Sequence, residues 1–144
     1  MAAASVCILV VDDFEPWRRC LCSFLQENTA WQIICEASDG LQAVEKSREL
    51  QPDIVLLDIG LPTLNGIEAA KQIREVSPAS RIVFLSENTC PDVVQEALRV
   101  GGCGYVVKGD AGKDLVAAMD AAIANKQFVG RRFQAHGFLN DAVS

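Results

Sequence analysis

Polar side chains follow four of the five short apolar runs in this 144-residue sequence. Asp12 and Asp13 follow the first run, Asp58 the third, Ser86 the fourth and Lys108 the fifth. Three carboxylates brought together repel one another and need a cation, and oxygen ligands without His or thiolate favour Mg²⁺ over Zn²⁺. Because Mg²⁺ readily shares phosphoryl oxygens, this set of residues indicates a phosphate-handling site.

Each of these residues has a chemical role in such a site and also an ordinary structural one. Lys108 can pair with a carboxylate and then a phosphate, Ser86 can donate a hydrogen bond, and an Asp beside both can act as a nucleophile. Alone, Asp13 fits a cap for a helix that opens at Pro16, Ser86 fits another cap, and Lys108 fits a solvated strand end. Jointly, their place after successive apolar runs favours a site.

The apolar runs are the elements that must position these residues, at 6–11, 31–35, 53–57, 81–85 and 104–107. Each is followed by a stretch with helical spacing, and the fifth of these stretches carries Leu115 to Ile123. Strict alternation of this kind predicts a parallel sheet covered by helices on both faces, the α/β class. Ligands of such sheets bind beyond the carboxyl ends of the strands, where the polar residues fall.

Composition excludes several classes of protein. Half of the residues are hydrophobic, which argues against a disordered chain, and the net charge of −6 argues against direct nucleic-acid binding. The longest uncharged N-terminal run, 2–11, is too short to span a membrane and lacks the basic residues of a secretory signal, so we expect a cytoplasmic protein.

The cysteines and the single histidine do not indicate bridges or a zinc site. The sequence has no CxxC motif, and His136 is far from any cysteine. We expect all six cysteines to be reduced and to act as small core residues: Cys7, Cys20, Cys22, Cys35, Cys90 and Cys103.

From about residue 6 to 124 the sequence resembles the receiver domain of two-component response regulators, which is CheY-like, and most of all the NarL/FixJ type. The most specific motif is at 52–66, where Asp58 is followed by Pro62 and Gly66 at the family's spacing. The Asp12–Asp13 pair, Ser86 and the Tyr105-x-x-Lys108 spacing fall in register with it.

The resemblance implies the architecture. It predicts a three-layer flavodoxin-like (βα)5 fold with a five-stranded parallel sheet in the strand order 2-1-3-4-5. Residues 1–125 would form the receiver domain, and residues 126–144 a C-terminal tail or the remnant of a linker.

The resemblance also implies an acceptor and a cofactor. Asp58 would be the phospho-acceptor and would attack the phosphohistidine of a sensor histidine kinase or phosphotransfer protein. Mg²⁺ would be bound by Asp13, Asp58 and the backbone carbonyl of Gly60, with Asp12 acting mostly through water.

Three further residues would respond to the transferred group. Lys108 would pair with Asp58 and then with the phosphoryl group, and Ser86 would move to hydrogen-bond it. Tyr105 would then rotate into the space that Ser86 leaves, although a strand tyrosine alone usually serves packing. The face that switches would be built by the fourth and fifth predicted helices and the fifth strand.

Some positions depart from the family pattern. Gly109 follows Lys108 where many members have proline, so a cis peptide there would cost more, and the isomer stays open. Glu87 stands where a small residue is common, and we expect it to slow phosphorylation by small anionic donors. Gly60 and Asn88 offer no general base for hydrolysis, which predicts a phosphoryl group that is not rapidly lost.

The leading interpretation is therefore a phospho-accepting signalling domain, not an enzyme that acts on an external metabolite. An aspartate-based phosphatase would want a carboxylate where Gly60 stands, and a flavin-binding protein would want a phosphate loop where Asp12 and Asp13 stand. A degenerate receiver that only binds other proteins is the alternative. The stretch after Phe128 is too short for a helix-turn-helix domain, so the chain is either a single-domain receiver or a piece of a transcription regulator; homodimerisation stays open.

Overall fold

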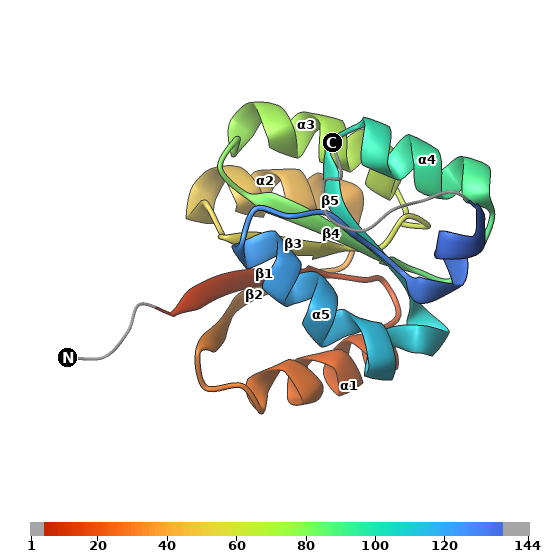
Figure 1. Cartoon of the computed structure of the whole chain (residues 1–144). Coiled ribbons are helices and arrows are strands. Elements are labelled where there is room, and N and C mark those ends of the chain that lie inside the picture. Colours follow the sequence, from red (N-terminus) through yellow and green to blue (C-terminus); the bar gives the residue numbers. More distant parts are fainter. Residues whose placement is uncertain (1–4, 137–144) are drawn as a thin grey trace.

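A computed structural model describes residues 5–136 as one parallel sheet between two layers of helices (Figure 1). The strands are β1 Val6–Val11, β2 Trp31–Ala37, β3 Ile54–Leu57, β4 Arg81–Ser86, β5 Gly102–Val107 and β6 Phe128–Val129. The helices are α1 Glu15–Gln26, α2 Gly40–Leu50, α3 Gly66–Val76, α4 Pro91–Arg99 and α5 Ala111–Ile123, with two short 3-10 helices, η1 Lys108–Asp110 and η2 Arg131–His136.

The central strands are buried because helices cover both faces of the sheet. On one face, α1 and α5 pack against the sheet through residues such as Leu25 and Leu115. On the other, α2, α3 and α4 contribute residues such as Val44, Ile73 and Val94. This explains why β1 and β3 read as continuous apolar runs and not as alternating ones.

The strand order 2-1-3-4-5 is confirmed, but the sheet has a sixth strand that the sequence prediction lacked. Strand β6 pairs in parallel with β5, with Gly104 opposite Phe128 and Tyr105 opposite Val129. A strand of two residues is too short to show periodicity, which is why the predicted five-stranded sheet was one strand short. It lies within the stretch 126–144 that was assigned to a tail or linker, of which 137–144 are outside the described residues.

The cysteines are only partly the core residues that we expected. None of the six forms a disulfide, and Cys22 is buried, but Cys20 and Cys90 are exposed. Burial raises the pKa of the Cys22 thiol to about 11, so it stays protonated and packs as a small apolar group. The side chain of His136 is outside the described part of the chain.

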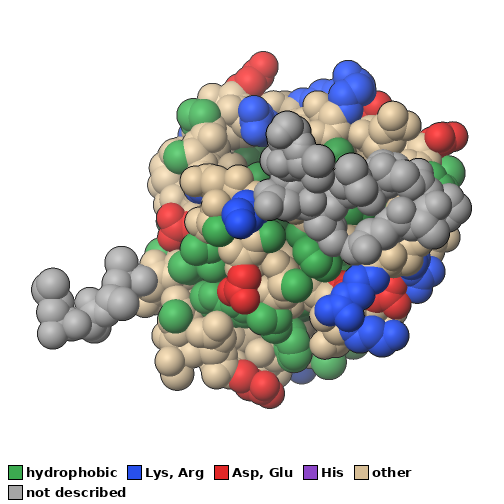
Figure 2. All heavy atoms as spheres, in the orientation of Figure 1, with side chains coloured by type: hydrophobic (Ala, Val, Ile, Leu, Met, Phe, Trp, Pro, Cys, Tyr) green, Lys and Arg blue, Asp and Glu red, His purple; other side chains and the backbone are tan. Residues whose placement is uncertain are grey.

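Hydrophobic side chains also reach the surface over α5, as Figure 2 shows on the face that this helix crosses. Val116 and Ile123 of α5 are both more than two-fifths exposed, at 43% and 42%. Among the residues that the structure describes, no helix is long and apolar enough to cross a membrane.

Candidate functional site

The carboxyl ends of β1, β3, β4 and β5 surround a cavity of about 740 Å³. Asp13, Asp58, Ser86 and Lys108 line it together with Gly60. The structure therefore brings together the side chains that the sequence placed at successive strand ends. Asp12 does not line the cavity, because it is almost fully buried, at 2% exposure.

Sheet register brings the two buried carboxylates together. Val11 of β1 pairs with Leu57 of β3, so Asp12 and Asp58 leave the sheet side by side. Each is fixed by a nearby main-chain amide: Phe14 donates to Asp12 Oδ1 at 2.9 Å, and Ile59 donates to Asp58 Oδ1 at 2.7 Å. These bonds leave the other carboxylate oxygens free to face a common partner.

That partner is Lys108, the residue that directly follows β5. Its Nζ lies 2.6 Å from Asp12 Oδ2 and 3.1 Å from Asp58 Oδ2. It also lies 5.7 Å from the centre of the Trp17 ring, within range of a cation–π contact. No cis peptide occurs among the described residues, so the Lys108–Gly109 peptide bond is trans, and Lys108 contacts both carboxylates with this backbone conformation.

Burial and charge shift the pKa values of this group in a consistent pattern. Burial raises the pKa of Asp58, the charge of Lys108 lowers it, and the charge of Asp12 raises it again, with a net increase. Burial lowers the pKa of Lys108, but its bond to Asp12 and the charges of both aspartates reverse that effect, so the pKa is raised. The ammonium therefore stays charged, whereas Asp58 is in an environment where its negative charge is costly.

The acidic residues also form a set of oxygen ligands. Asp12, Asp13 and Asp58 each offer a carboxylate oxygen, and these atoms lie within 4.8 Å of one another. Asp13 is exposed, so this set opens to the cavity on one side. An all-oxygen set that is open to water is the donor chemistry that suits Mg²⁺.

The motif around Asp58 has a steric explanation. Gly66 begins α3 directly against the loop that follows Asp58, and a Cβ there would lie 2.0 Å from the carbonyl oxygen of Asp58. Only glycine permits this approach. The helix is capped by Asn65, whose side chain accepts a hydrogen bond from the amide of Glu68 at 3.0 Å.

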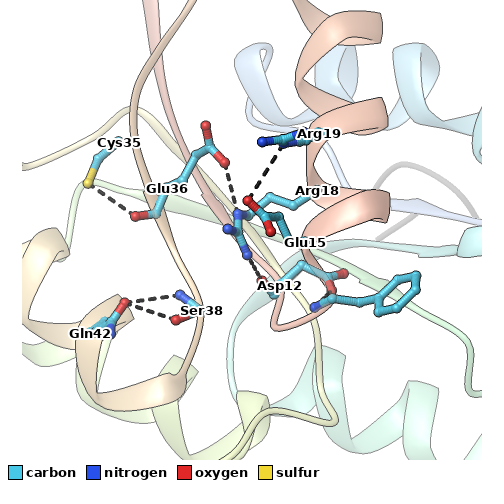
Figure 3. Close-up of polar contacts among 9 residues, drawn as sticks. Asp12, Glu15, Arg18, Arg19, Cys35, Glu36, Ser38 and Gln42 are labelled. Atoms are coloured by element: carbon cyan, nitrogen blue, oxygen red, sulfur yellow. Dashed lines mark hydrogen bonds and ion pairs between the residues drawn. The ribbon is translucent and has the colours of Figure 1, made fainter.

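Sequence reasoning missed Arg18 of α1, which supports the loop after β1 that carries Asp12 and Asp13 (Figure 3). Its Nη1 donates to the carbonyl oxygen of Asp12 at 2.6 Å, and its Nε donates to Glu36 Oε1 of β2 at 2.8 Å. One guanidinium thus joins three elements of the fold. Its position five residues after Asp13 was the available signal, but nothing local to the sequence indicated Glu36 as a partner.

Ser86 and Tyr105 are connected through the loop that follows β4. The amide of Asn88 donates to Ser86 Oγ at 3.1 Å, and Tyr105 Oη donates to the carbonyl oxygen of Asn88 at 2.8 Å. Tyr105 is fully buried in this structure and does not line the cavity. The predicted rotation into a vacated space stays a prediction.

The capping role that the sequence suggested for Asp13 is not observed. Asp13 does not cap α1, because the residue before that helix is Phe14 and no side chain caps it. Glu87 lines the cavity, and its side chain is exposed.

The model of the response regulator receiver domain matches residues 8–120, and the chain belongs to this family. The transcriptional regulatory protein LnrK of Bacillus subtilis is 36% identical over 112 residues, which are 78% of this chain and 51% of that protein. The chemotaxis protein CheY of Thermotoga maritima is 37% identical over 101 residues, 70% of this chain and 83% of that protein. The chain spans about half the length of the transcriptional regulators that it matches.

Solved structures agree with this assignment. A two-component response regulator of the LuxR family from Aurantimonas has a TM-score of 0.87 and 29% identity, covering 92% of this chain and 94% of that one. The CheX–CheY–BeF3–Mg²⁺ complex from Borrelia burgdorferi contains a chain with a TM-score of 0.78 and 25% identity, covering 83% of this chain and 90% of that one. Receiver domains generally bind Mg²⁺ at an acidic pocket, and this chain has the matching aspartate cluster.

Proposed function

We propose that this receiver accepts a phosphoryl group on Asp58 from a phosphohistidine of a sensor histidine kinase or phosphotransfer protein. One observation carries the proposal: Lys108 Nζ lies within 3.1 Å of Asp58 and 2.6 Å of Asp12, beside an open cavity. A buried acceptor carboxylate with a fixed ammonium beside it is arranged for positioning and for charge neutralisation, the two main requirements of phosphoryl transfer.

The reaction moves the phosphoryl group from the donor histidine to Asp58. An oxygen of Asp58 attacks phosphorus, the P–N bond to the donor imidazole breaks, and the imidazole nitrogen keeps the electron pair and takes up a proton. Lys108 then pairs with the phosphoryl oxygens, and Ser86 donates a hydrogen bond to one of them. The domain turns over only its own phosphoryl group and acts on no external metabolite.

The oxygen ligands of the site are suited to binding Mg²⁺. Asp13, Asp58 and the carbonyl of Gly60 would hold the ion directly and Asp12 mostly through water, and the ion would supply positive charge beside the transferred group. The related CheX–CheY complex that contains BeF3 and Mg²⁺ supports this part of the proposal.

The family and its relatives suggest the wider role. Relatives named transcriptional regulatory proteins support a place in a two-component pathway in the cytoplasm, with an output that includes transcription. The switching surface would be the face built by α4, β5 and α5, because Tyr105 of β5 is linked to Ser86 through Asn88.

The test is incubation with acetyl phosphate and Mg²⁺, followed by intact mass measurement. We expect one added phosphoryl group in the wild-type chain and none in Asp58→Asn or in the presence of EDTA. Asp53→Asn is the matched control, because Asp53 precedes the same strand and accepts a bond from the amide of Cys7 at 2.7 Å, away from the residues that line the cavity. No added mass with this donor or with a phosphorylated histidine phosphotransfer protein would favour a domain that acts only by binding other proteins.

A further inference from the structure

The indole ring of Trp17 forms part of the cavity wall beside Lys108. Trp17 lies in the first turn of α1, directly after Pro16, and it lines the cavity together with Asp58 and Lys108. The Nζ of Lys108 lies over its ring, 5.7 Å from the ring centre. Phosphoryl transfer as proposed uses Lys108 and Asp58 and assigns no part to this ring.

Packing, and not hydrogen bonding, fixes the orientation of the indole. Trp17 is half-buried and packs against the apolar cluster that α1 and α5 form with the sheet. Its Nε1 is buried and has no hydrogen-bond partner among the described residues. A buried indole N–H usually has an acceptor, so this orientation carries a cost that the other contacts of the ring must offset. One of those contacts is with the Lys108 ammonium.

Lys108 has partners of two kinds, two charged and one neutral. Its Nζ lies 2.6 Å from Asp12 Oδ2 and 3.1 Å from Asp58 Oδ2, and the neutral partner is the face of Trp17. Phosphorylation would turn the carboxylate of Asp58 into an acyl phosphate and place negative charge on the phosphoryl oxygens instead. Lys108 must then exchange its contact with Asp58 for a phosphoryl oxygen. The charge of the ring is the same before and after this exchange.

A partner that does not change during the reaction can hold the ammonium throughout it. A lysine side chain loses much rotamer freedom when it is fixed, and a contact that fixes it beforehand removes part of that cost from the reaction. The side chain of Lys108 is only 11% exposed, so water screens the attraction between its charge and the ring only weakly.

We propose that Trp17 is a positioning residue for the phosphorylation of Asp58. The face of its ring holds the Lys108 ammonium in the cavity while the anion that the ammonium faces changes from a carboxylate to a phosphoryl group. The inference rests on the proposed function and adds to it a residue that acts through Lys108. An aromatic face, and not apolar bulk alone, is what this position requires.

The rate of phosphorylation by acetyl phosphate and Mg²⁺, followed by intact mass, tests the need for an aromatic face. Trp17→Leu should slow the reaction about 5-fold, the effect of losing about 1 kcal/mol of cation–π attraction. Trp17→Phe keeps an aromatic ring and should recover most of the rate. Trp31→Leu is the matched control and should react like the wild type, because Trp31 begins β2 and lines a separate cavity with Phe24 and Val116.

A double-mutant cycle tests whether Trp17 acts through Lys108. In the Lys108→Ala background, Trp17→Leu should slow the reaction no further, because the ammonium that the ring holds is absent. A ring that served packing alone would give the same loss in both backgrounds. If Trp17→Leu fails to fold, Trp17→Met takes its place in the cycle, since methionine adapts to irregular gaps and has no ring.

The outcomes separate this inference from the proposed function. If the wild-type chain gains one phosphoryl group and Trp17→Leu reacts as fast as Trp31→Leu, the positioning role is overturned and the proposed function stands. Trp17→Phe as slow as Trp17→Leu, or an equal loss with and without Lys108, would overturn the role in the same way. No added mass in the wild-type chain would contradict the proposed function, and the inference with it.

Discussion

The two sides of the cavity are built in different ways. On the side of β1 and β3, the amides of Phe14 and Ile59 fix the carboxylates of Asp12 and Asp58, and these amides are one or two residues away in the chain. On the side of β4 and β5, Ser86 and Tyr105 are held through contacts that end in a segment more than twenty residues further on.

The difference separates a fixed part of the site from a responsive part. The side of β1 and β3, which carries Asp58, is called the acceptor side below, and the side of β4 and β5 is called the responsive side. Short-range contacts to main-chain amides in a sheet buried on both faces leave little freedom to move. Contacts that end at Phe133, in the short 3-10 helix η2 that follows the two-residue edge strand β6, can break locally without unfolding the domain. The acceptor side can thus keep its conformation while the contacts of Ser86 and Tyr105 on the responsive side rearrange.

Lys108 joins the two sides, so its removal should have the largest effect. Lys108→Ala leaves Asp12 and Asp58 buried without their cation, and we expect a loss of about 3 kcal/mol in the free energy of unfolding. Phosphorylation by acetyl phosphate should slow about 100-fold, since a donor to the developing charge is lost. Urea denaturation and mass spectrometry measure the two quantities.

Lys113→Ala is the control for this change, because Lys113 is exposed on α5. A Lys108→Ala variant as stable and as reactive as the control would show that the two sides act independently.

The rigidity of the acceptor side depends on Gly66. Gly66→Ala places a Cβ 2.0 Å from the carbonyl oxygen of Asp58, and we expect it to cost about 3 kcal/mol of stability, at the upper end of usual single substitutions. Gly112→Ala in α5 meets no atom within 4 Å and should change stability by no more than about 1 kcal/mol. Thermal denaturation of the pair measures the difference, and equal melting temperatures would contradict a fixed acceptor loop.

The negative charge of Asp58 should reduce the free energy of unfolding when no metal ion is bound. Its pKa is raised above the usual 3.8 by burial, so the folded chain binds a proton more tightly than the unfolded chain. Stability therefore falls as pH rises from about 3.8 through the raised value, and it stays lower above that range.

Asp58→Asn removes this cost. In EDTA at pH 7 we expect the variant to be more stable than the wild type by about 1 kcal/mol, and the gap should narrow as the pH is lowered. Urea denaturation at several pH values measures it. A variant that is less stable at pH 7, with an unchanged pH dependence, would show that Lys108 dominates the acceptor side and that burial does not.

Glu87 should have the smallest effect, because it is exposed at the rim of the cavity. Glu87→Ala should speed phosphorylation by acetyl phosphate about 2–3-fold at low ionic strength, by removing repulsion of an anionic donor. The gain should shrink in high salt. Glu75→Ala on the exposed face of α3 is the control. Equal phosphorylation rates for the two variants would show that the charge of Glu87 does not slow the reaction.

The sequence predicted the acceptor side well, for a physical reason. Residues that follow buried strands must meet at one edge of a parallel sheet, so Asp12 and Asp58 could be placed together from the apolar runs alone. The spacing from Asp58 to Gly66 reflects a steric contact that is local to the loop.

The responsive side was only partly predictable. Strand β6 has two residues and no periodicity, and the contact between Phe133 and Tyr105 joins positions that sequence spacing does not relate. The bond from Arg18 to Glu36 likewise joins a helix to an edge strand. Such contacts depend on tertiary packing, which local patterns do not encode.

The identity of the phosphorylated residue tests the central claim most directly. Sodium borohydride reduces an aspartyl phosphate to homoserine, which changes the mass of one peptide. After incubation with acetyl phosphate and Mg²⁺, we expect homoserine at position 58 in the wild-type chain and at no position in Asp58→Asn. Homoserine at Asp12 or Asp13, or the same labelling in the variant, would contradict the account of Asp58 as the acceptor.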